Sequence, residues 1–122
     1  MRQATVYIDR EALQYNLNRV KQLAPNTQIV SMVKANAYGH GVKDCLVALK
    51  STDAFGVACL EEALEIRELG YQHPITLIEG VFSEDEMHVV VEQKIECVIH
   101  HAQQVEWLQA HKAAYIGQGL KV

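Results

Sequence analysis

The sequence predicts an α/β fold in which parallel strands alternate with helices. Short apolar runs recur along the chain, and each is followed by a longer segment with helical periodicity. The runs begin near Ile29, Ala54, Ile75 and Glu96, roughly 21 to 25 residues apart, as consecutive βα units require. Because these runs are largely apolar, the pattern favours a parallel sheet that is covered by helices.

The first part of the chain predicts a short strand, a helix and a buried strand. The segment ATVYID (residues 4–9) alternates well enough to form a strand at the N-terminus. Asp9 can cap the next helix, which Pro25 stops. IVSMVK (residues 29–34) is the first strand of the repeating set, and a glycine-containing loop leads to a helix over residues 42–50. The apolar stripe of the capped helix comprises Leu13, Leu17, Val20 and Leu23.

The next two units have clear end signals. AFGVA (residues 54–58) predicts a strand, and a helix over residues 61–69 follows, with Gly70 ending it in the C′ position. ITLIEG (residues 75–80) predicts another strand. Ser83 to Glu86, SEDE, has the form of a capping box, and the helix that it opens should bury Met87, Val90 and Val91.

The last part of the chain contains one further unit and the start of another. ECVIH (residues 96–100) predicts a strand, and a helix is expected around residues 105–108. LKV (residues 120–122) is expected to begin another strand. Two architectures fit: an open doubly wound sheet, or about half of a (β/α)8 barrel, which typically needs ~250 residues. The end of the chain where a strand begins favours the half barrel, as a single partial domain over residues 1–122.

Composition and charge narrow the possible partners and compartment. The 122 residues carry a net charge of −4 without a basic patch, which argues against nucleic acid or an anionic membrane as a partner. The longest apolar run, residues 54–60, is too short to cross a bilayer, and the start has no signal-peptide core. Cys45, Cys59 and Cys97 are odd in number and widely spaced, which indicates free thiols in a cytoplasmic protein.

Lys34 is the residue on which a functional hypothesis rests. In an extended strand Val30, Met32 and Lys34 share one face, so the lysine follows apolar residues at the C-terminal strand end. Ligands bind at that end in parallel α/β folds. A partly desolvated lysine there can attack a carbonyl and form a Schiff base with an aldehyde cofactor. Tyr38 can add a ring wall and a hydroxyl donor. A solvated surface lysine is the alternative interpretation.

Residues near Lys34 and at the other strand ends are further candidates for this site. Gly39 and Gly41 let the backbone turn tightly near a ligand. Glu79 and His100 stand at strand ends and can form a ring with Lys34, although a charge at a loop entry is the commoner role. His40 can orient the loop, and no metal site is predicted, because the adjacent His100 and His101 lack further ligands at suitable spacing. The remaining assignments are structural: Cys59 as a packed thiol, and Glu61 and Glu62 as carboxylates that favour a helix dipole.

The segment VKANAYGHG (residues 33–41), preceded by a capped helix and IVSM, closely resembles the pyridoxal-phosphate motif of bacterial alanine racemases. The resemblance continues in VYIDREALQYNLNRVKQLAP (residues 6–25), FGVACLEEALEIRELG (residues 55–70) and PITLIEGVF (residues 74–82). It covers essentially the whole chain, and these segments are similar to the amino-terminal half of that family.

The resemblance implies a fold and a chemistry. Members of this family have an eight-stranded α/β barrel followed by a β-rich domain, act as homodimers, and interconvert L-alanine and D-alanine for the cell wall. It implies that Lys34 holds pyridoxal 5′-phosphate covalently and then acts as the acid/base on one face of the substrate. It also implies that Tyr38 matches a tyrosine that lies beside the cofactor and helps to hold its phosphate.

The chain also lacks parts that the resemblance implies. The opposite-face catalytic tyrosine, the arginine facing the pyridine nitrogen and much of the phosphate cup belong to downstream segments of the family. We therefore expect an amino-terminal fragment that is inactive alone, with open sheet edges and an N-terminal strand that lacks its mate. Two alternatives stay open: a pyridoxal-phosphate-binding barrel protein that does not racemise, and an inert α/β binding module in which Lys34 is a surface residue.

Overall fold

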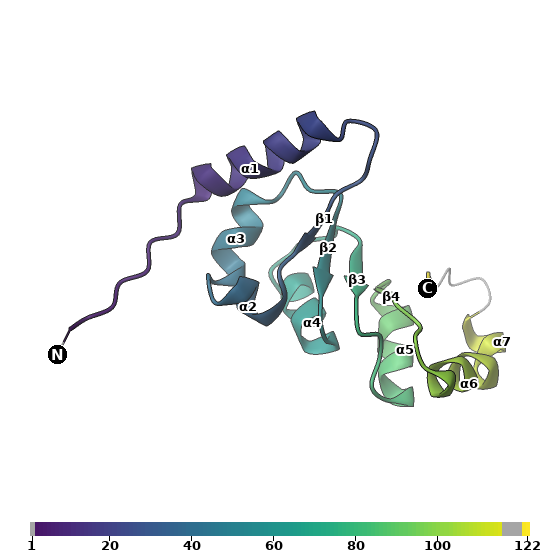
Figure 1. Cartoon of the computed structure of the whole chain (residues 1–122). Coiled ribbons are helices and arrows are strands. Elements are labelled where there is room, and N and C mark those ends of the chain that lie inside the picture. Colours follow the sequence, from purple (N-terminus) through teal and green to yellow (C-terminus); the bar gives the residue numbers. More distant parts are fainter. Residues whose placement is uncertain (1, 116–120) are drawn as a thin grey trace.

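The computed structural model describes residues 2–115 and 121–122, with the side chains of residues 2–113, 121 and 122, and it shows strands alternating with helices (Figure 1). The strands are β1 (Val30–Met32), β2 (Ala54–Val57), β3 (Ile75–Leu77) and β4 (Glu96–Cys97). The helices are α1 (Arg10–Leu23), α2 (Lys34–Tyr38), α3 (Val42–Ala48), α4 (Leu60–Glu68), α5 (Glu84–Glu92), α6 (Ala102–Ala110) and α7 (Lys112–Tyr115).

The four strands form one parallel sheet in the order β1-β2-β3-β4. Each strand therefore lies beside the next one in the sequence, whereas the strand order of a doubly wound sheet reverses at a switch point. Sequential order with helical crossovers is the arrangement of a (β/α)8 barrel. The α/β repeat is confirmed, and of the two predicted architectures the half barrel is the one that this order fits.

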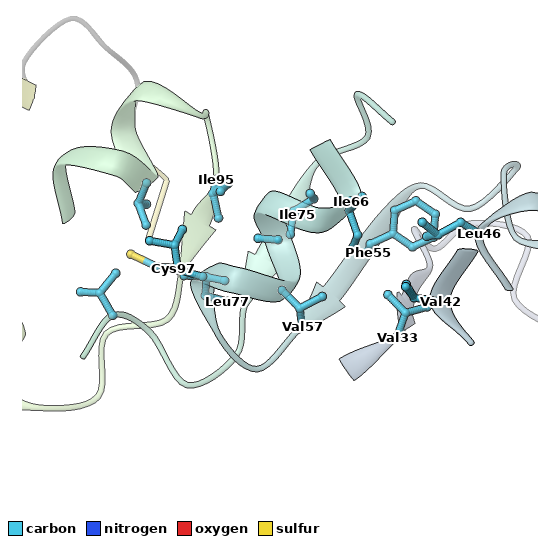
Figure 2. Close-up of a cluster of buried hydrophobic side chains, with 14 of the residues drawn as sticks. Val33, Val42, Leu46, Phe55, Val57, Ile66, Ile75, Leu77, Ile95 and Cys97 are labelled. Atoms are coloured by element: carbon cyan, nitrogen blue, oxygen red, sulfur yellow. The ribbon is translucent and has the colours of Figure 1, made fainter. Parts of the chain in front are cut away.

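The hydrophobic core lies between the sheet and the helices that follow its strands (Figure 2). Phe55 and Val57 of β2 are fully buried, as are Ile75 and Leu77 of β3. Burying a large apolar side chain contributes about 1.5–3 kcal/mol, so this cluster is the main source of stability. Helices contribute further fully buried side chains, which include Leu46, Ile66, Met87 and Val90.

The opposite face of the sheet is more open. Val30 is 48% exposed on β1, and Val98, just after β4, is 38% exposed. Met32 lies over Gly56 of the neighbouring strand, because a Cβ built on that glycine would be 2.3 Å from the methionine sulfur. Val33, the next residue, is buried in the core instead. Val30 and Met32 therefore share the open face, as the strand alternation predicts.

The predicted N-terminal strand at residues 4–9 is wrong. Residues 2–9 form no regular element, and Val6 and Tyr7 are 73% and 88% exposed. This segment extends away from the body of the molecule (Figure 1). A strand needs a neighbour for its backbone hydrogen bonds, and no segment within the described residues pairs with this one. Alternating polarity was therefore not sufficient to form a strand here.

The predicted helix caps are confirmed. The Asp9 carboxylate accepts a hydrogen bond from the Ala12 backbone N–H at 2.9 Å, and the Ser83 hydroxyl accepts one from the Glu86 N–H at 3.3 Å. The Glu86 carboxylate binds the N–H of Phe82 rather than that of Ser83, so the box is shifted by one residue. Met87, Val90 and Val91 are buried as predicted.

The apolar stripe of α1 is only partly covered. Leu17 is buried, but Val20 and Leu23 are 46% and 68% exposed, so the predicted apolar stripe is covered only toward the start of the helix. α1 packs against α3 rather than across the sheet, and a seven-residue helix cannot cover a fourteen-residue one.

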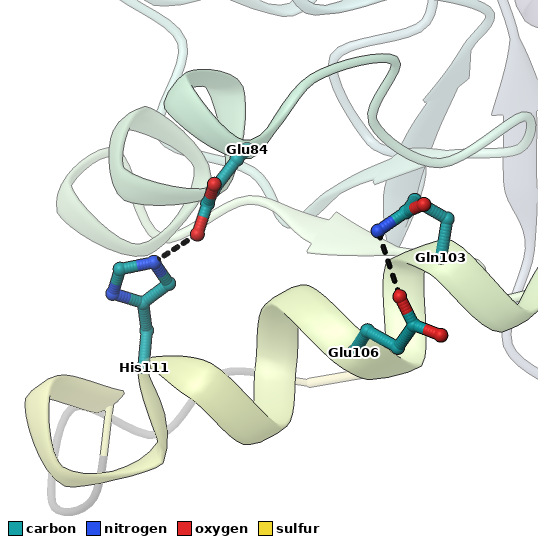
Figure 3. Close-up of polar contacts among 4 residues, drawn as sticks. All are labelled: Glu84, Gln103, Glu106 and His111. Atoms are coloured by element: carbon teal, nitrogen blue, oxygen red, sulfur yellow. Dashed lines mark hydrogen bonds and ion pairs between the residues drawn. The ribbon is translucent and has the colours of Figure 1, made fainter.

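Polar contacts join the elements at the end of the chain. The His111 imidazole contacts the Glu84 carboxylate and so links the end of α6 to the start of α5 (Figure 3). Beside β4, the Lys121 carbonyl accepts a hydrogen bond from the Cys97 N–H at 3.2 Å. Leu120, the first residue of the predicted last strand, lies outside the described residues, and residues 121–122 are not strand. None of the described helices is both long and apolar enough to cross a membrane.

Candidate functional site

Lys34 stands where β1 leaves the sheet. The last backbone hydrogen bond between the ends of β1 and β2 runs from the Val33 N–H to the Gly56 carbonyl, at 2.9 Å. The lysine follows directly and is half-buried. Within residues 2–115 and 121–122, its amine has neither a hydrogen-bond partner nor an ion-pair partner. The structure therefore places an uncommitted amine at the C-terminal end of a parallel strand, where ligands bind in this architecture.

The residues after Lys34 form a left-handed helical turn. Ala35, Asn36 and Ala37 have φ near 50° and ψ near 50°, and Tyr38 has φ of 56°. This conformation costs L-residues about 1–2 kcal/mol each and normally occurs only at single positions. The sequence analysis assigned the tight turn to Gly39 and Gly41. Both have positive φ, but the left-handed backbone already begins at Ala35.

A set of hydrogen bonds holds the turn in place. The Ala37 N–H donates to the Val33 carbonyl at 2.9 Å, and the Gly41 N–H donates to the Asn36 carbonyl at 3.0 Å. The Asn36 side-chain oxygen accepts the N–H of Val42 at 2.9 Å, which ties the turn to the first residue of α3. Asn36 was not predicted as a site residue, although asparagine tolerates the left-handed region better than most residues.

His40 also contacts the turn. Its Nδ1 lies 2.8 Å from the carbonyl oxygen of Ala37, and its backbone N–H donates to the same oxygen at 3.0 Å. These two contacts to the Ala37 carbonyl are what the predicted role of His40, orienting the loop, requires.

Glu62 is a second residue that the sequence analysis missed. Its Oε1 accepts the N–H of Ala35 at 2.7 Å, and its Oε2 accepts the N–H of Ala58 at 2.8 Å. The two N–H groups follow neighbouring strands, β1 and β2. Glu62 lies in the first turn of α4, as predicted, but the expectation that its carboxylate favours the helix dipole and does nothing more is wrong. A glutamate at the third residue of a helix is a known signal for backbone capping, and it could have indicated this contact.

Tyr38 lies beside a pocket that Lys34 does not line. Tyr38 is 58% exposed and lines a pocket of about 370 Å³ between α1 and the left-handed turn. Lys34 does not line this pocket. Its walls are mainly apolar and include Ile8, Leu13, Val33, Ala37 and Leu49.

Glu79 and His100 lie together near the C-terminal ends of β3 and β4. The His100 Nε2 is 2.7 Å from the Glu79 backbone carbonyl oxygen, so the contact does not involve the glutamate carboxylate. Both residues line a pocket of about 270 Å³ that Lys34 does not share. Of the predicted ring of three residues, the structure therefore shows the contact between His100 and the Glu79 backbone. Within the described ranges, no group of three or more His, Cys, Asp or Glu residues is placed to hold a metal ion.

The three cysteines are free thiols, as the sequence predicts. Burial raises the pKa of the Cys97 thiol to about 11 and also raises the pKa of Cys45. The pKa of Cys59 is raised by burial first, and the nearby carboxylates of Glu61 and Glu62 add to the effect against an opposing backbone hydrogen bond. A thiol with a raised pKa is a poor nucleophile at neutral pH, so Cys59 is a packed thiol, as predicted.

Comparison with known proteins gives a consistent family. The family described as alanine racemase, N-terminal domain, matches residues 8–122. The curated alanine racemase of Legionella pneumophila (strain Corby) is 53% identical over 108 residues, which are 88% of this chain. Those residues are 30% of that relative, so the chain spans about a third or less of the length of the curated relatives that it matches.

Solved structures show the same fold. Alanine racemase from Acinetobacter baumannii is 80% identical with a TM-score of 0.93, covering all of this chain and 34% of that one. Alanine racemase from Bartonella henselae with covalently bound pyridoxal phosphate is 28% identical with a TM-score of 0.79. That match covers 88% of this chain and 31% of the Bartonella chain.

Proposed function

The chain belongs to the alanine racemase N-terminal domain family, and from this premise we propose that it is the amino-terminal part of a pyridoxal 5′-phosphate-dependent racemase. The reaction is the interconversion of L-alanine and D-alanine, the activity named for the curated relatives. One observation carries the proposal: the uncommitted Lys34 amine stands at a C-terminal strand end, ahead of a fixed backbone turn.

The residues present fit part of a pyridoxal phosphate site. An aldehyde cofactor needs a primary amine that is near the ligand-binding end and is not engaged in an ion pair, and Lys34 meets both conditions. Tyr38 exposes its side chain four residues further along, and we propose that its hydroxyl donates to the phosphate. When bound, pyridoxal phosphate supplies an electron-withdrawing ring that makes the Cα proton of an amino acid acidic.

Lys34 carries the chemistry that this chain can contribute. Its amine would hold the cofactor covalently, and it would exchange a proton with the substrate Cα on one face. Racemisation needs a second acid/base on the opposite face. We propose that this group, much of the phosphate site and the rest of the barrel lie in segments of the protein beyond this chain. The 122 residues alone are then inactive.

The family assignment extends to the setting of the reaction. We propose that the protein acts as a homodimer in the cytoplasm and supplies D-alanine for peptidoglycan. Three free thiols support a reducing compartment. A site that is incomplete within this chain is consistent with further groups contributed from elsewhere in the assembly.

The test begins with the cofactor and uses the full-length protein that contains this sequence. The protein is incubated with pyridoxal phosphate and reduced with borohydride, and the adduct is mapped by peptide mass spectrometry. We expect one dominant adduct on Lys34. Lys34→Ala should remove that adduct and lower racemisation by several orders of magnitude, because no other amine replaces it. Lys43→Ala, on the exposed side of α3, is the matched control and should retain both.

Each other outcome contradicts a specific part of the proposal. An adduct on Lys34 without racemisation of alanine would indicate a pyridoxal-phosphate-binding protein that does not racemise. Labelling spread over surface lysines, with no preference for Lys34, would refute the cofactor site and favour the inert binding module.

A further inference from the structure

We propose that Glu62 is a positioning residue for Lys34, because its carboxylate fixes the peptide group that follows the lysine. The inference rests on the proposed function, in which Lys34 is the reacting amine. It concerns a residue that lies on a different element, at the start of α4, and that holds Lys34 through the backbone.

The Glu62 carboxylate contacts the backbone directly after Lys34. Glu62 Oε1 accepts the N–H of Ala35 at 2.7 Å, and this N–H belongs to the peptide bond joined to the Lys34 Cα. Holding that peptide plane fixes ψ of Lys34, and with it the direction in which the side chain leaves the backbone. A hydrogen bond at any later residue of the turn would act on Lys34 less directly.

The Glu62 carboxylate also takes the place of a hydrogen bond between the ends of β1 and β2. β1 and β2 exchange their last ladder hydrogen bond between Val33 and Gly56, and beyond it the strands have no further mutual bond. The two Glu62 oxygens bind Ala35 at one strand end and Ala58 at the other. One carboxylate thus continues the connection between neighbouring strand ends beyond the end of the sheet. Both bonds are short, as charge-assisted hydrogen bonds are.

The backbone turn that follows Lys34 is strained. Four successive residues from Ala35 to Tyr38 have left-handed backbone angles, which L-residues adopt only when their surroundings impose them. Most hydrogen bonds of the turn are local: they join residues 33 to 42 to one another. Glu62 belongs to α4, 27 residues away in sequence from Ala35, and it binds Ala35, the first residue of the left-handed stretch. This contact therefore ties the start of the turn to α4 and to the end of β2.

The consequence for the reaction is geometric. Without the carboxylate, the peptide after Lys34 can rotate and the strained turn can relax toward ordinary backbone angles. A displacement of about 1 Å of a reacting group can lower the rate by about 10²-fold. Cofactor capture should also weaken, because the same amine holds the cofactor.

The test compares Glu62→Gln with two matched controls in the full-length protein. Glutamine keeps the size of the side chain but replaces one carboxylate oxygen with an NH2 donor, so it cannot accept both N–H groups in the present arrangement, in which each oxygen binds one of them. Glu61→Gln removes the same charge one residue earlier, from a side chain that does not contact the turn. Ser83→Ala removes the N-cap of α5, which should lower stability by a comparable amount away from Lys34.

Four measurements are made on each variant: kcat and KM for alanine, the yield of the borohydride-fixed Lys34 adduct, amide hydrogen exchange of peptides spanning residues 34–41, and the melting temperature. For Glu62→Gln we expect kcat to fall about 10- to 100-fold, with less adduct and faster exchange in this segment. Glu61→Gln and Ser83→Ala should keep kcat within about twofold and leave this exchange unchanged.

The outcomes separate this inference from the proposed function. A wild-type protein that forms no Lys34 adduct and does not racemise would refute the proposed function itself. A competent wild type in which Glu62→Gln behaves like Glu61→Gln would overturn only the role of Glu62. The same conclusion follows if activity merely tracks the melting temperature across Glu62→Gln and Ser83→Ala, because Glu62 would then act only through stability.

Discussion

The thiol of Cys97 lies in the core with 1% of its surface exposed, and burial raises its pKa from 9.0 to about 11. Below pH 9 the thiol is protonated in both the folded and the unfolded chain. Between pH 9 and 11 the unfolded chain loses this proton and the folded chain keeps it. The free energy of unfolding should therefore fall as pH rises through this range.

The prediction is a difference in slope between wild type and Cys97→Val, which keeps an apolar side chain of similar size. The stability of the wild type should fall by roughly 2–3 kcal/mol more than that of the variant between pH 9 and 11. Urea unfolding across this pH range measures both curves. Parallel curves would show that the thiol is not desolvated in the folded protein.

Lys34 illustrates the residue scale in another way. The order of residues along the chain places it after a buried strand, and that part of the prediction needed no structure. Its uncommitted amine and half-buried position are structural facts that depend on neighbours remote in sequence. Its role as the cofactor lysine stays a prediction, as does the phosphate contact of Tyr38.

At the scale of elements, the left-handed turn is the feature that the sequence analysis failed to predict. Ala35 and Ala37 would be ordinary residues in a right-handed helix, and Asn36 is the only one of the three whose residue type tolerates positive φ. By contrast, α1, α4 and α5 begin within one residue of the predicted positions. Their start and stop signals, Asp9, Gly70 and Ser83, act on adjacent backbone groups and so can be seen in the sequence.

The turn predicts an inverted response to glycine. Ala35→Gly removes the methyl group that makes positive φ costly, and this gain should equal or exceed the entropic cost of glycine. We expect the free energy of unfolding to stay the same or to rise by up to about 1 kcal/mol. Ala12→Gly, in the right-handed α1, should lower it by about 0.5–1 kcal/mol.

Chemical denaturation of the two variants beside the wild type provides the measurement. Equal destabilisation by both substitutions would mean that residue 35 is not held in the left-handed region in solution.

At the scale of the whole molecule, the open strand β1 is the feature with physical consequences. Among the residues that the structure describes, β1 has a partner strand on one side only, and Val30 is 48% exposed on the uncovered face of the sheet. Unpaired strand edges with apolar residues are sites of association. We therefore expect the isolated 122-residue chain to self-associate at concentrations where a closed domain would be monomeric.

Val30→Lys tests this expectation, because a charge on an edge strand disfavours pairing between chains. Val47→Lys is the matched control: Val47 is 43% exposed, but it lies on α3. Sedimentation velocity should show a lower average mass for Val30→Lys than for wild type or Val47→Lys. The same mass for all three chains would mean that this edge does not mediate association.

Three features could be predicted from the sequence alone: the alternation of strands and helices, the helix caps, and the position of Lys34 at the end of a buried strand. These features depend on periodicity and on contacts between residues close in the chain, so they can be inferred without coordinates. Three other features are visible only in the folded chain: residues 2–9 form no strand, residues 35–38 turn left-handed, and Glu62 holds the peptide after Lys34. Those three outcomes depend on which distant groups are present to accept or donate hydrogen bonds. A local signal such as a capping glutamate at residue 62 can indicate that a contact forms, but the distant partner of the contact cannot be read from the sequence.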